Sequence, residues 1–197
     1  DGLSSFGGYI GCTFVAIWFF RSRKLDVLKF GDILMLGLAF GIFVGRLGCF
    51  VVHDHIGLEV SDAPQLVQTL FGWMAVEFPP GTAENGRSSL RFDGGFMEAV
   101  NGLMTFTVLA ILARKPRPAG FLLGVAPIVY GTNRFFNDFV RHSDLSSADN
   151  RWGPFTPAQW FSCVLVIVGV TLLIKVWNKP KWPDGTETPW EPKAEAA

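Results

Sequence analysis

The sequence predicts an all-α integral membrane protein with five transmembrane helices and an outer loop or head segment. The chain has 197 residues, of which 49% are hydrophobic, 14% aromatic and only 17% charged, with a mean hydropathy of +0.32. A soluble domain usually has about a quarter charged residues, so this composition favours a membrane protein. The apolar content excludes intrinsic disorder, and a net charge of zero argues against a nucleic-acid partner.

The apolar residues gather in five runs, at about residues 3–20, 33–52, 96–113, 121–140 and 158–176. A helix needs roughly 20 mostly apolar residues to cross a bilayer, and the first, third and fifth runs satisfy this directly. The second and fourth runs contain Arg46 and Arg134, and an arginine at membrane depth is costly and usually functional. A soluble protein with buried helices is the alternative interpretation.

The charged residues between the runs predict an orientation, because basic residues collect on the cytoplasmic side of a membrane. Basic clusters follow the first, third and fifth runs, whereas segments 53–93 and 141–151 carry Asp and Glu. We therefore expect the first residue outside and the C-terminus in the cytoplasm. Residues 1–177 would form the transmembrane domain, with an outer loop at 53–95, and residues 178–197 a polar, disordered cytoplasmic tail. The chain opens at Asp1 without a Met and its first span begins at once, so a fragment or processed product is expected. The first apolar run lacks the features of a cleavable signal peptide.

Two sets of small residues are candidates for close helix contacts, because glycine lets a second helix backbone approach. In the second span glycines recur every four residues, at Gly37, Gly41 and Gly45. The first span contains a similar set, at Gly7, Gly8 and Gly11. The alternative is that glycine is simply common in membrane helices.

The fourth span carries a polar stripe. Its members are spaced four, four and three residues apart and share one helix face: Tyr130, Arg134, Asp138 and Arg141. Asn133 lies beside them, and such a stripe should face the protein interior or a water-filled cleft. An ion pair between Arg134 and Asp138 that only holds helices together is the alternative, but it leaves Tyr130 without a role.

Arg46 lies between two glycines in the stretch GRLGCF, where a large anion could approach closely. A guanidinium suits bidentate phosphate recognition, so we interpret Arg46 as a phosphate contact. The alternative is a structural arginine that extends to the outer interface.

His53, Asp54 and His55 follow the second span on the outer side. Two histidines around an acid could ligate a metal or carry protons, although a solvated loop end is favoured and no metal or cofactor is expected. Asp54 as a proton acceptor at the interface is an intermediate possibility. No serine is paired with a histidine at a recognisable spacing, and no phosphate-binding loop or zinc-protease motif occurs.

Four stretches in order, SSFGGYIG, GRLGCFVVHDHIG, ARKPRPAG and VYGTNRFFNDFVR, resemble the prolipoprotein diacylglyceryl transferase family. Two further stretches, RFDGGFMEA and FTPAQWFS, resemble the segments before the third and the last span. The resemblance covers the chain up to about Trp177.

The resemblance implies a bacterial inner-membrane enzyme that transfers the diacylglyceryl group of phosphatidylglycerol to the lipobox cysteine of a prolipoprotein, releasing glycerol phosphate. It implies phosphatidylglycerol, a prolipoprotein lipobox peptide and the lipid bilayer as partners. Family members have seven spans with the N-terminus outside, and the five spans expected here fit the last five.

Carried over by position, the resemblance implies four catalytic residues, which are Arg46, Asp54, Tyr130 and Arg134. A leaving phosphate gains charge, and fixed guanidinium groups would stabilise it. The residues expected to bind substrate are Gly7, Gly8, Cys49, Gly57, Arg91, Glu98, Asn133, Asp138 and Arg141.

Three departures from the family pattern concern the chemistry. Phe6 stands where the family has a histidine before the two glycines, and Cys49 stands where it usually has Asn. The segment before Glu98 also lacks the usual histidine, glutamine and tyrosine. Thiolate formation could fall to Asp54, His53 or His55. The alternative function is a catalytically impaired paralogue that binds anionic phospholipid or a lipoprotein, and a small-solute transporter is less favoured because the polar residues cluster toward the outer half.

Overall fold

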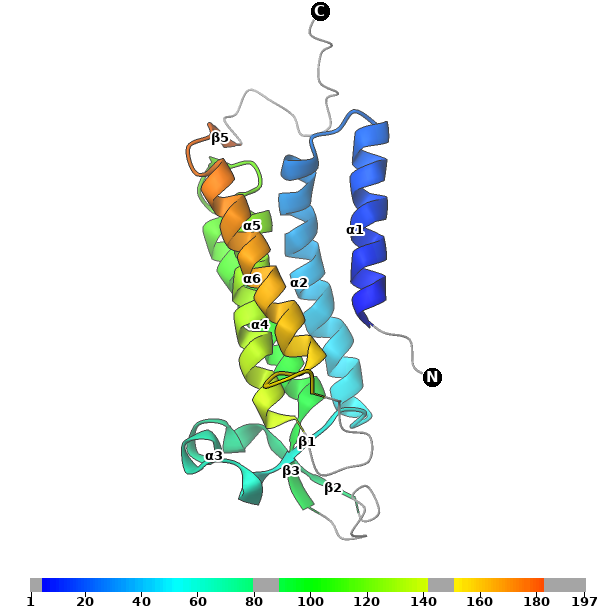
Figure 1. Ribbon diagram of the computed structural model, residues 1–197, viewed down its shortest axis with the longest axis vertical. Helices are drawn as coiled ribbons and strands as arrows, with labels where there is room; N and C mark the ends of the chain where they lie inside the picture. Colours follow the sequence, from blue (N-terminus) through cyan, green and yellow to red (C-terminus); the bar gives the residue numbers. More distant parts are fainter. Residues whose placement is uncertain (1–4, 80–88, 142–150, 183–197) are drawn as a thin grey trace, which may run out of the picture.

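A computed structural model describes residues 5–79, 89–141 and 151–182, most of which are helical. Five long helices run side by side in it (Figure 1). They are α1 (Ser5–Ser22), α2 (Val27–Val51), α4 (Gly94–Leu112), α5 (Phe121–Asn137) and α6 (Pro157–Val176). Helices α2, α4 and α6 are long and apolar enough to cross a membrane. The prediction of a helical membrane protein is confirmed at this level.

Side-chain caps explain where several helices begin. Asp26 accepts hydrogen bonds from the backbone N–H groups of Leu28 and Lys29, so α2 begins at Val27 and not at the apolar run from residue 33. Thr156 and Gln159 form a capping box at the start of α6. These caps satisfy donors that would otherwise be unpaired at a helix end.

Helix α5 is capped from another helix. Asp32, on α2 and only 5% exposed, accepts hydrogen bonds from the backbone N–H groups of Gly120 (2.8 Å) and Leu123 (2.7 Å). Gly120 has a φ of +91°, which glycine adopts without strain. The carboxylate therefore fixes the start of α5 against α2.

Close helix contacts occur at glycines other than those predicted. A Cβ at Gly169 of α6 would lie 2.6 Å from the carbonyl oxygen of Gly124 on α5, and a Cβ at Gly102 of α4 would lie 2.7 Å from the backbone nitrogen of Phe43 on α2. The two predicted glycine sets have no described atom within 4 Å of a Cβ. The predicted close contacts along α1 and α2 are therefore absent from the described part of the chain. Periodicity places glycines on one face but does not reveal which helix packs there.

Helix α1 lies beside α2 and apart from the rest of the bundle (Figure 1). The rings of Phe20 and Phe30 pack together near the turn that joins the two helices, with 5.3 Å between centroids. Several large apolar side chains of α1, among them Phe14 and Trp18, are exposed. An apolar and exposed helix surface is the expected result in a lipid environment, where the acyl chains cover it.

Residues 53–95 form more than the predicted outer loop, and the all-α prediction is incomplete here. Three antiparallel strands lie in the order β1–β3–β2, namely β1 (Ile56–Glu59), β2 (Ala75–Phe78) and β3 (Ser89–Asp93). Between β1 and β2 lie the short helix α3 (Gln65–Phe71) and the 3-10 turns η1 (Val60–Asp62) and η2 (Gly72–Met74). Figure 1 shows this unit at one end of the helices. Strands of four or five residues are too short to show a clear alternation in the sequence.

The first residues of the segment predicted as a polar, disordered tail include a short strand. Lys181–Trp182 form strand β5, which pairs with β4 (Arg117–Pro118) after α4. Residues 183–197, the rest of that predicted tail, lie outside the described residues.

Candidate functional site

Glu98 on α4 joins two residues of the predicted stripe on α5. The hydroxyl of Tyr130 donates a hydrogen bond of 3.0 Å to Oε2 of Glu98, and Nε of Arg134 lies 3.1 Å from Oε1. Glu98 is 6% exposed and follows the cap made by Asp93 at the start of α4. Asn101, one turn further along α4, donates to the backbone oxygen of Tyr130 at 3.4 Å. Helix α4 thus supplies the partners of Tyr130 and Arg134 on α5.

Asp138 extends the cluster to α6. One of its carboxylate oxygens lies 2.9 Å from Nη1 of Arg134, and the other accepts a hydrogen bond from the hydroxyl of Thr156, the cap of α6. Arg141 approaches the same carboxylate at 3.9 Å. Asp138 is 3% exposed and begins the 3-10 turn η3 (Asp138–Val140). The end of α5 and the start of α6 therefore meet at one carboxylate.

The charge on Arg134 is largely offset by its neighbours. Its guanidinium is 19% exposed and lies between the carboxylates of Glu98 and Asp138. Buried charges are tolerated only when they are paired, and removal of one partner leaves an uncompensated charge. This network is therefore built to hold its members in fixed positions.

Arg46 lies in a different environment, at the end of α2. Its Nη1 lies 3.1 Å from Nε2 of His55 and 4.0 Å from Sγ of Cys49. The ion pairs formed by the described residues do not include Arg46. Its guanidinium is therefore not engaged by a described carboxylate and is available to an anion.

The two clusters lie at the same end of the bundle. The carbonyl oxygen of His55 accepts a hydrogen bond of 2.8 Å from the backbone N–H of Gly94, the first residue of α4. Gly57, two residues beyond His55, forms an isolated antiparallel bridge with Arg141. The segment after Arg46 is thereby tied to both α4 and the end of α5.

The environment of His55 favours its neutral form. Burial and the positive charge of Arg46 lower the pKa of His55 below its ordinary value of 6.5. Arg141 adds to this effect, whereas Asp54 and Glu98 oppose it. Asp54 is exposed, with Oδ2 3.4 Å from Nδ1 of His55, and that nitrogen is buried without a hydrogen bond.

Cys49, Asp54 and His55 each place one potential ligand atom within 4.8 Å of the others. The guanidinium of Arg46 lies against both Cys49 and His55. A second positive charge at this place would be repelled, so the donor set does not favour a metal ion.

Some predicted residues serve the sheet. Arg91 is 2% exposed, and it donates to the carbonyl oxygen of Gly57 at 3.1 Å and lies 3.7 Å from Glu59. A Cβ at Gly57 would overlap the carbonyl oxygen of Phe92, so only glycine lets β1 pass this close to β3. Both residues therefore shape the unit that holds His55.

Other predicted residues are not brought to either cluster. Gly7 and Gly8 are exposed on α1, and Asn133 bonds to the carbonyl oxygen of Val129 in its own helix at 3.0 Å. Among residues missed in the sequence, Asn101 had a usable signal: it lies three residues after Glu98 in an apolar run, on the same helix face. The bond of Thr156 to Asp138 and that of Asp32 to Gly120 had none, because the partners are distant in sequence.

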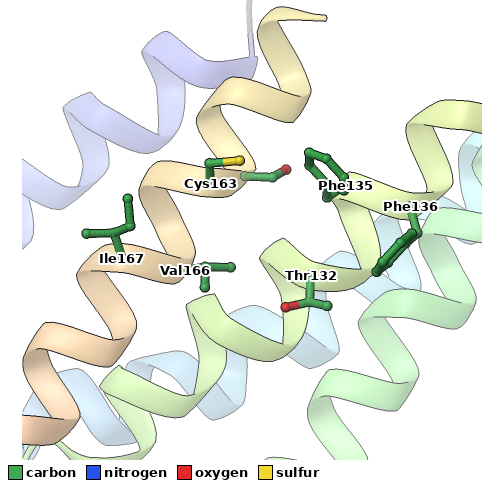
Figure 2. A pocket seen from close by; sticks show the side chains of 7 residues that line it. Thr132, Phe135, Phe136, Cys163, Val166 and Ile167 are labelled. Carbon is green, nitrogen blue, oxygen red and sulfur yellow. The ribbon is translucent and has the colours of Figure 1, made fainter. Parts of the chain in front are cut away.

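An apolar groove of about 320 Å³ lies between α5 and α6, and no charged residue of the two clusters lines it. Figure 2 shows its lining, to which α5 contributes Thr132, Phe135 and Phe136 and α6 contributes Cys163, Val166 and Ile167. We assign no part of a reaction to this groove.

The fold and the clusters define a multi-pass membrane protein with a polar site, rich in arginine and carboxylate, at one end of its helices. The chain belongs to the prolipoprotein diacylglyceryl transferase family, whose model matches residues 1–175.

Curated relatives with the name phosphatidylglycerol–prolipoprotein diacylglyceryl transferase are 28 to 29% identical to this chain. That of Pseudomonas putida strain F1 is 28% identical over 180 residues, which are 90% of this chain and 62% of the relative. That of Rhodopseudomonas palustris is 28% identical over 191 residues, 95% of this chain and 62% of the relative. That of Pseudomonas fluorescens is 29% identical over 182 residues, 91% of this chain and 63% of the relative. The chain thus spans less than two thirds of the length of these curated relatives.

Proposed function

We propose that this protein transfers the diacylglyceryl group of phosphatidylglycerol to the lipobox cysteine thiol of a prolipoprotein. The observation that carries the proposal is the environment of Arg46. In a chain of this family, Arg46 forms no ion pair with a described carboxylate, and it lies at the same end of the bundle as the buried Glu98–Arg134 network. An anionic phosphodiester would supply the negatively charged partner for the guanidinium of Arg46.

The proposed reaction breaks the bond between the glyceryl carbon and a phosphate oxygen while a thiolate forms a bond to that carbon. Negative charge then grows on the departing phosphate, and Arg46 stabilises it. Arg134 makes the second contact with the phosphate or its glycerol, held in position by Glu98 and Asp138. Tyr130 fixes Glu98, and Cys49 and Arg141 border the lipid headgroup.

The proposed setting is the bacterial inner membrane. All five long helices would span it, with the first residue and the sheet of residues 53–95 outside and the C-terminus in the cytoplasm. In support, the basic clusters after α1, α4 and α6 follow the rule for cytoplasmic ends. Residues 1–177 would form the transferase domain and 178–197 a cytoplasmic tail.

The test is transfer to a lipobox peptide by the protein in vesicles of phosphatidylglycerol, followed by mass spectrometry. The peptide should gain the mass of one diacylglyceryl group. Arg46→Ala should abolish this gain, whereas the matched control Arg114→Ala, at the exposed cytoplasmic end of α4, should retain it. Failure of the protein in a preparation where a curated relative succeeds would overturn the proposal.

Phe6 favours a second candidate, a paralogue that binds anionic phospholipid or a lipoprotein without turnover. The resemblance implies a histidine at this position in the family, and phenylalanine cannot accept a proton. Native mass spectrometry that finds retained phosphatidylglycerol, together with no transfer by either the protein or Phe6→His, would establish this alternative. Gain of transfer on Phe6→His would instead show a complete site that lacks one base.

A further inference from the structure

We propose that His55 accepts the thiol proton, and that Arg46 occupies the Nε2 lone pair of His55 until an anionic phosphate draws the guanidinium away. This inference rests on the proposed function and adds to it a proton acceptor and an order of binding. It assigns His55, rather than Asp54 or His53, to the step for which the sequence left all three open.

The contact between Arg46 and His55 determines where the imidazole proton lies. A guanidinium has only donors, so Nε2 of His55 must accept the hydrogen bond from Nη1 at 3.1 Å. In the neutral ring the single proton is then on Nδ1. Nδ1 faces the carboxylate of Asp54 at 3.4 Å, and a small movement would complete a hydrogen bond there. The pair has the arrangement of a base with an acid behind it.

Four charged groups act on His55. Arg46 lies on α2, Asp54 precedes the histidine, Glu98 lies on α4 and Arg141 follows α5. Burial and the two arginines keep the imidazole neutral at neutral pH, so it is in the form that can accept a proton. Departure of Arg46 would remove one of the two positive charges and make His55 a stronger base.

The alternatives are engaged elsewhere or exposed. Nδ1 of His53 is bonded at 2.9 Å to Asp93, which is fully buried and caps α4 through the N–H of Phe96. That histidine therefore belongs to the start of α4. The side chain of Asp54 is 66% exposed, and its carboxylate lies where it can support an imidazolium at His55.

The main chain holds His55 in place independently of its side chain. Its carbonyl oxygen accepts a hydrogen bond of 2.8 Å from Gly94, and a Cβ at Gly94 would lie 3.1 Å from the Cβ of His55. A substitution of the ring can therefore be made without removing the contact that positions the segment.

The proposed step is balanced. The phosphate binds Arg46, and the proton of the thiol moves to the freed Nε2 of His55. The sulfur electron pair forms the bond to the glyceryl carbon, and the electron pair of the breaking C–O bond remains on the phosphate. The imidazolium then returns its proton to the glycerol phosphate, so His55 ends neutral and can again accept from Arg46.

The first experiment measures transfer to the lipobox peptide by His55→Gln between pH 6 and 9, with His53→Gln as the matched control. Loss of a general base reduces the rate by about 100- to 10,000-fold. We expect a loss of this size in kcat for His55→Gln, with phosphatidylglycerol binding unchanged. The rate of the variant should continue to rise toward about pH 8.5, where the thiol ionises unaided, whereas the wild-type rate levels off at lower pH. His53→Gln should keep the wild-type pH profile.

Several results distinguish the inference from the proposed function. If His55→Gln transfers with the wild-type rate and pH profile while Arg46→Ala is inactive, His55 is not the base and the proposed function stands. If the wild-type protein transfers nothing, both fall. If His55→Gln does not fold, His55→Gly with added imidazole replaces it, and a rate that imidazole fails to restore overturns the assignment.

A second experiment tests the displacement of Arg46. Nitrogen NMR of ¹⁵N-histidine-labelled protein should show Nε2 of His55 as an acceptor without lipid and a raised imidazole pKa when phosphatidylglycerol replaces phosphatidylcholine. Arg46→Ala should show no such response to the lipid headgroup. An unchanged His55 signal on addition of phosphatidylglycerol would exclude the order of events proposed here.

Discussion

The hydroxyl of Tyr130 on α5 donates a hydrogen bond of 3.0 Å to the carboxylate of Glu98 on α4, which joins the two helices by side chains inside the bundle. Glu98 is nearly buried, so if the hydroxyl of Tyr130 is removed, no water replaces it as the donor to Oε2 of Glu98. A buried group left without its partner costs about 1–3 kcal/mol.

Tyr130→Phe should therefore lower the stability of the protein by about 1–3 kcal/mol, measured by thermal unfolding in detergent. Asn133→Ala is the control, since among the described residues that side chain bonds only within its own helix turn. Equal effects of the two substitutions would show that the bond to Glu98 contributes nothing specific.

Arg134→Met should be more damaging, because it leaves Glu98 and Asp138 close together without the cation between them. Breaking a buried pair costs about 3–5 kcal/mol. The double variant with Glu98→Gln should recover part of this loss, since one of the two uncompensated charges is gone. Thermal unfolding of both variants and of the single Glu98→Gln gives the coupling, and a coupling of zero would contradict the network.

Asp32→Ala should loosen the start of α5. The substitution removes the acceptor of two backbone hydrogen bonds, from Gly120 and Leu123, and loss of a helix cap costs about 1–2 kcal/mol. Hydrogen exchange of the first turn of α5 should increase. Asp32→Asn keeps an acceptor oxygen and should show a smaller increase in hydrogen exchange than Asp32→Ala. A larger increase in Asp32→Asn would show that the charge of Asp32, and not its hydrogen bonds to the backbone, holds the start of α5.

Gly57→Ala should distort the sheet, because the added Cβ would overlap the carbonyl oxygen of Phe92. Overpacking of this kind costs about 1–3 kcal/mol or more. Gly72→Ala provides the comparison: Gly72 has open space around it and a right-handed helical backbone, so the change should be nearly neutral. Thermal unfolding of the pair checks both, and similar stabilities would contradict the close approach of β1 and β3.

The neutral His55 predicts how stability depends on pH. Its pKa in the folded protein is lowered below 6.5 by burial and by Arg46, so the unfolded chain binds the proton more readily than the folded one. The part of the free energy of unfolding that depends on His55 is therefore fully present above pH 6.5. It is lost as the pH falls from 6.5 toward the lower pKa of the folded protein. Melting temperatures of the wild type and His55→Gln, compared between pH 7.5 and 5.5, should show a steeper loss in the wild type. Parallel curves would exclude a lowered pKa.

The sequence predicted those features that depend on neighbours along the chain. The pairing of Arg134 with Asp138 follows from a spacing of four residues on a helix. The positions of the long helices follow from apolar runs, and the structure extends α2 backward only because Asp26 caps it. Local caps and periodicity are short-range signals, so a single sequence contains them.

The remaining features depend on partners that are distant in sequence. Nothing around Tyr130 indicates that Glu98, on another helix, accepts its hydrogen bond. Likewise, His55 and Gly94 are joined through the backbone across the whole sheet-forming segment. The acceptor role of Nε2 of His55 became evident only when the structure placed Arg46 against it.

Asp138 and Thr156 are bonded to each other although they lie 18 residues apart in the sequence. The two ends of the connection between α5 and α6 are therefore held together by a side-chain hydrogen bond. The entropy of closing a chain grows only slowly as residues are added, by about 0.6 kcal/mol for each doubling. An insertion beyond Arg141, between residues 142 and 150, should accordingly leave the two helices joined at Asp138 and Thr156, so a reporter tag can be placed there.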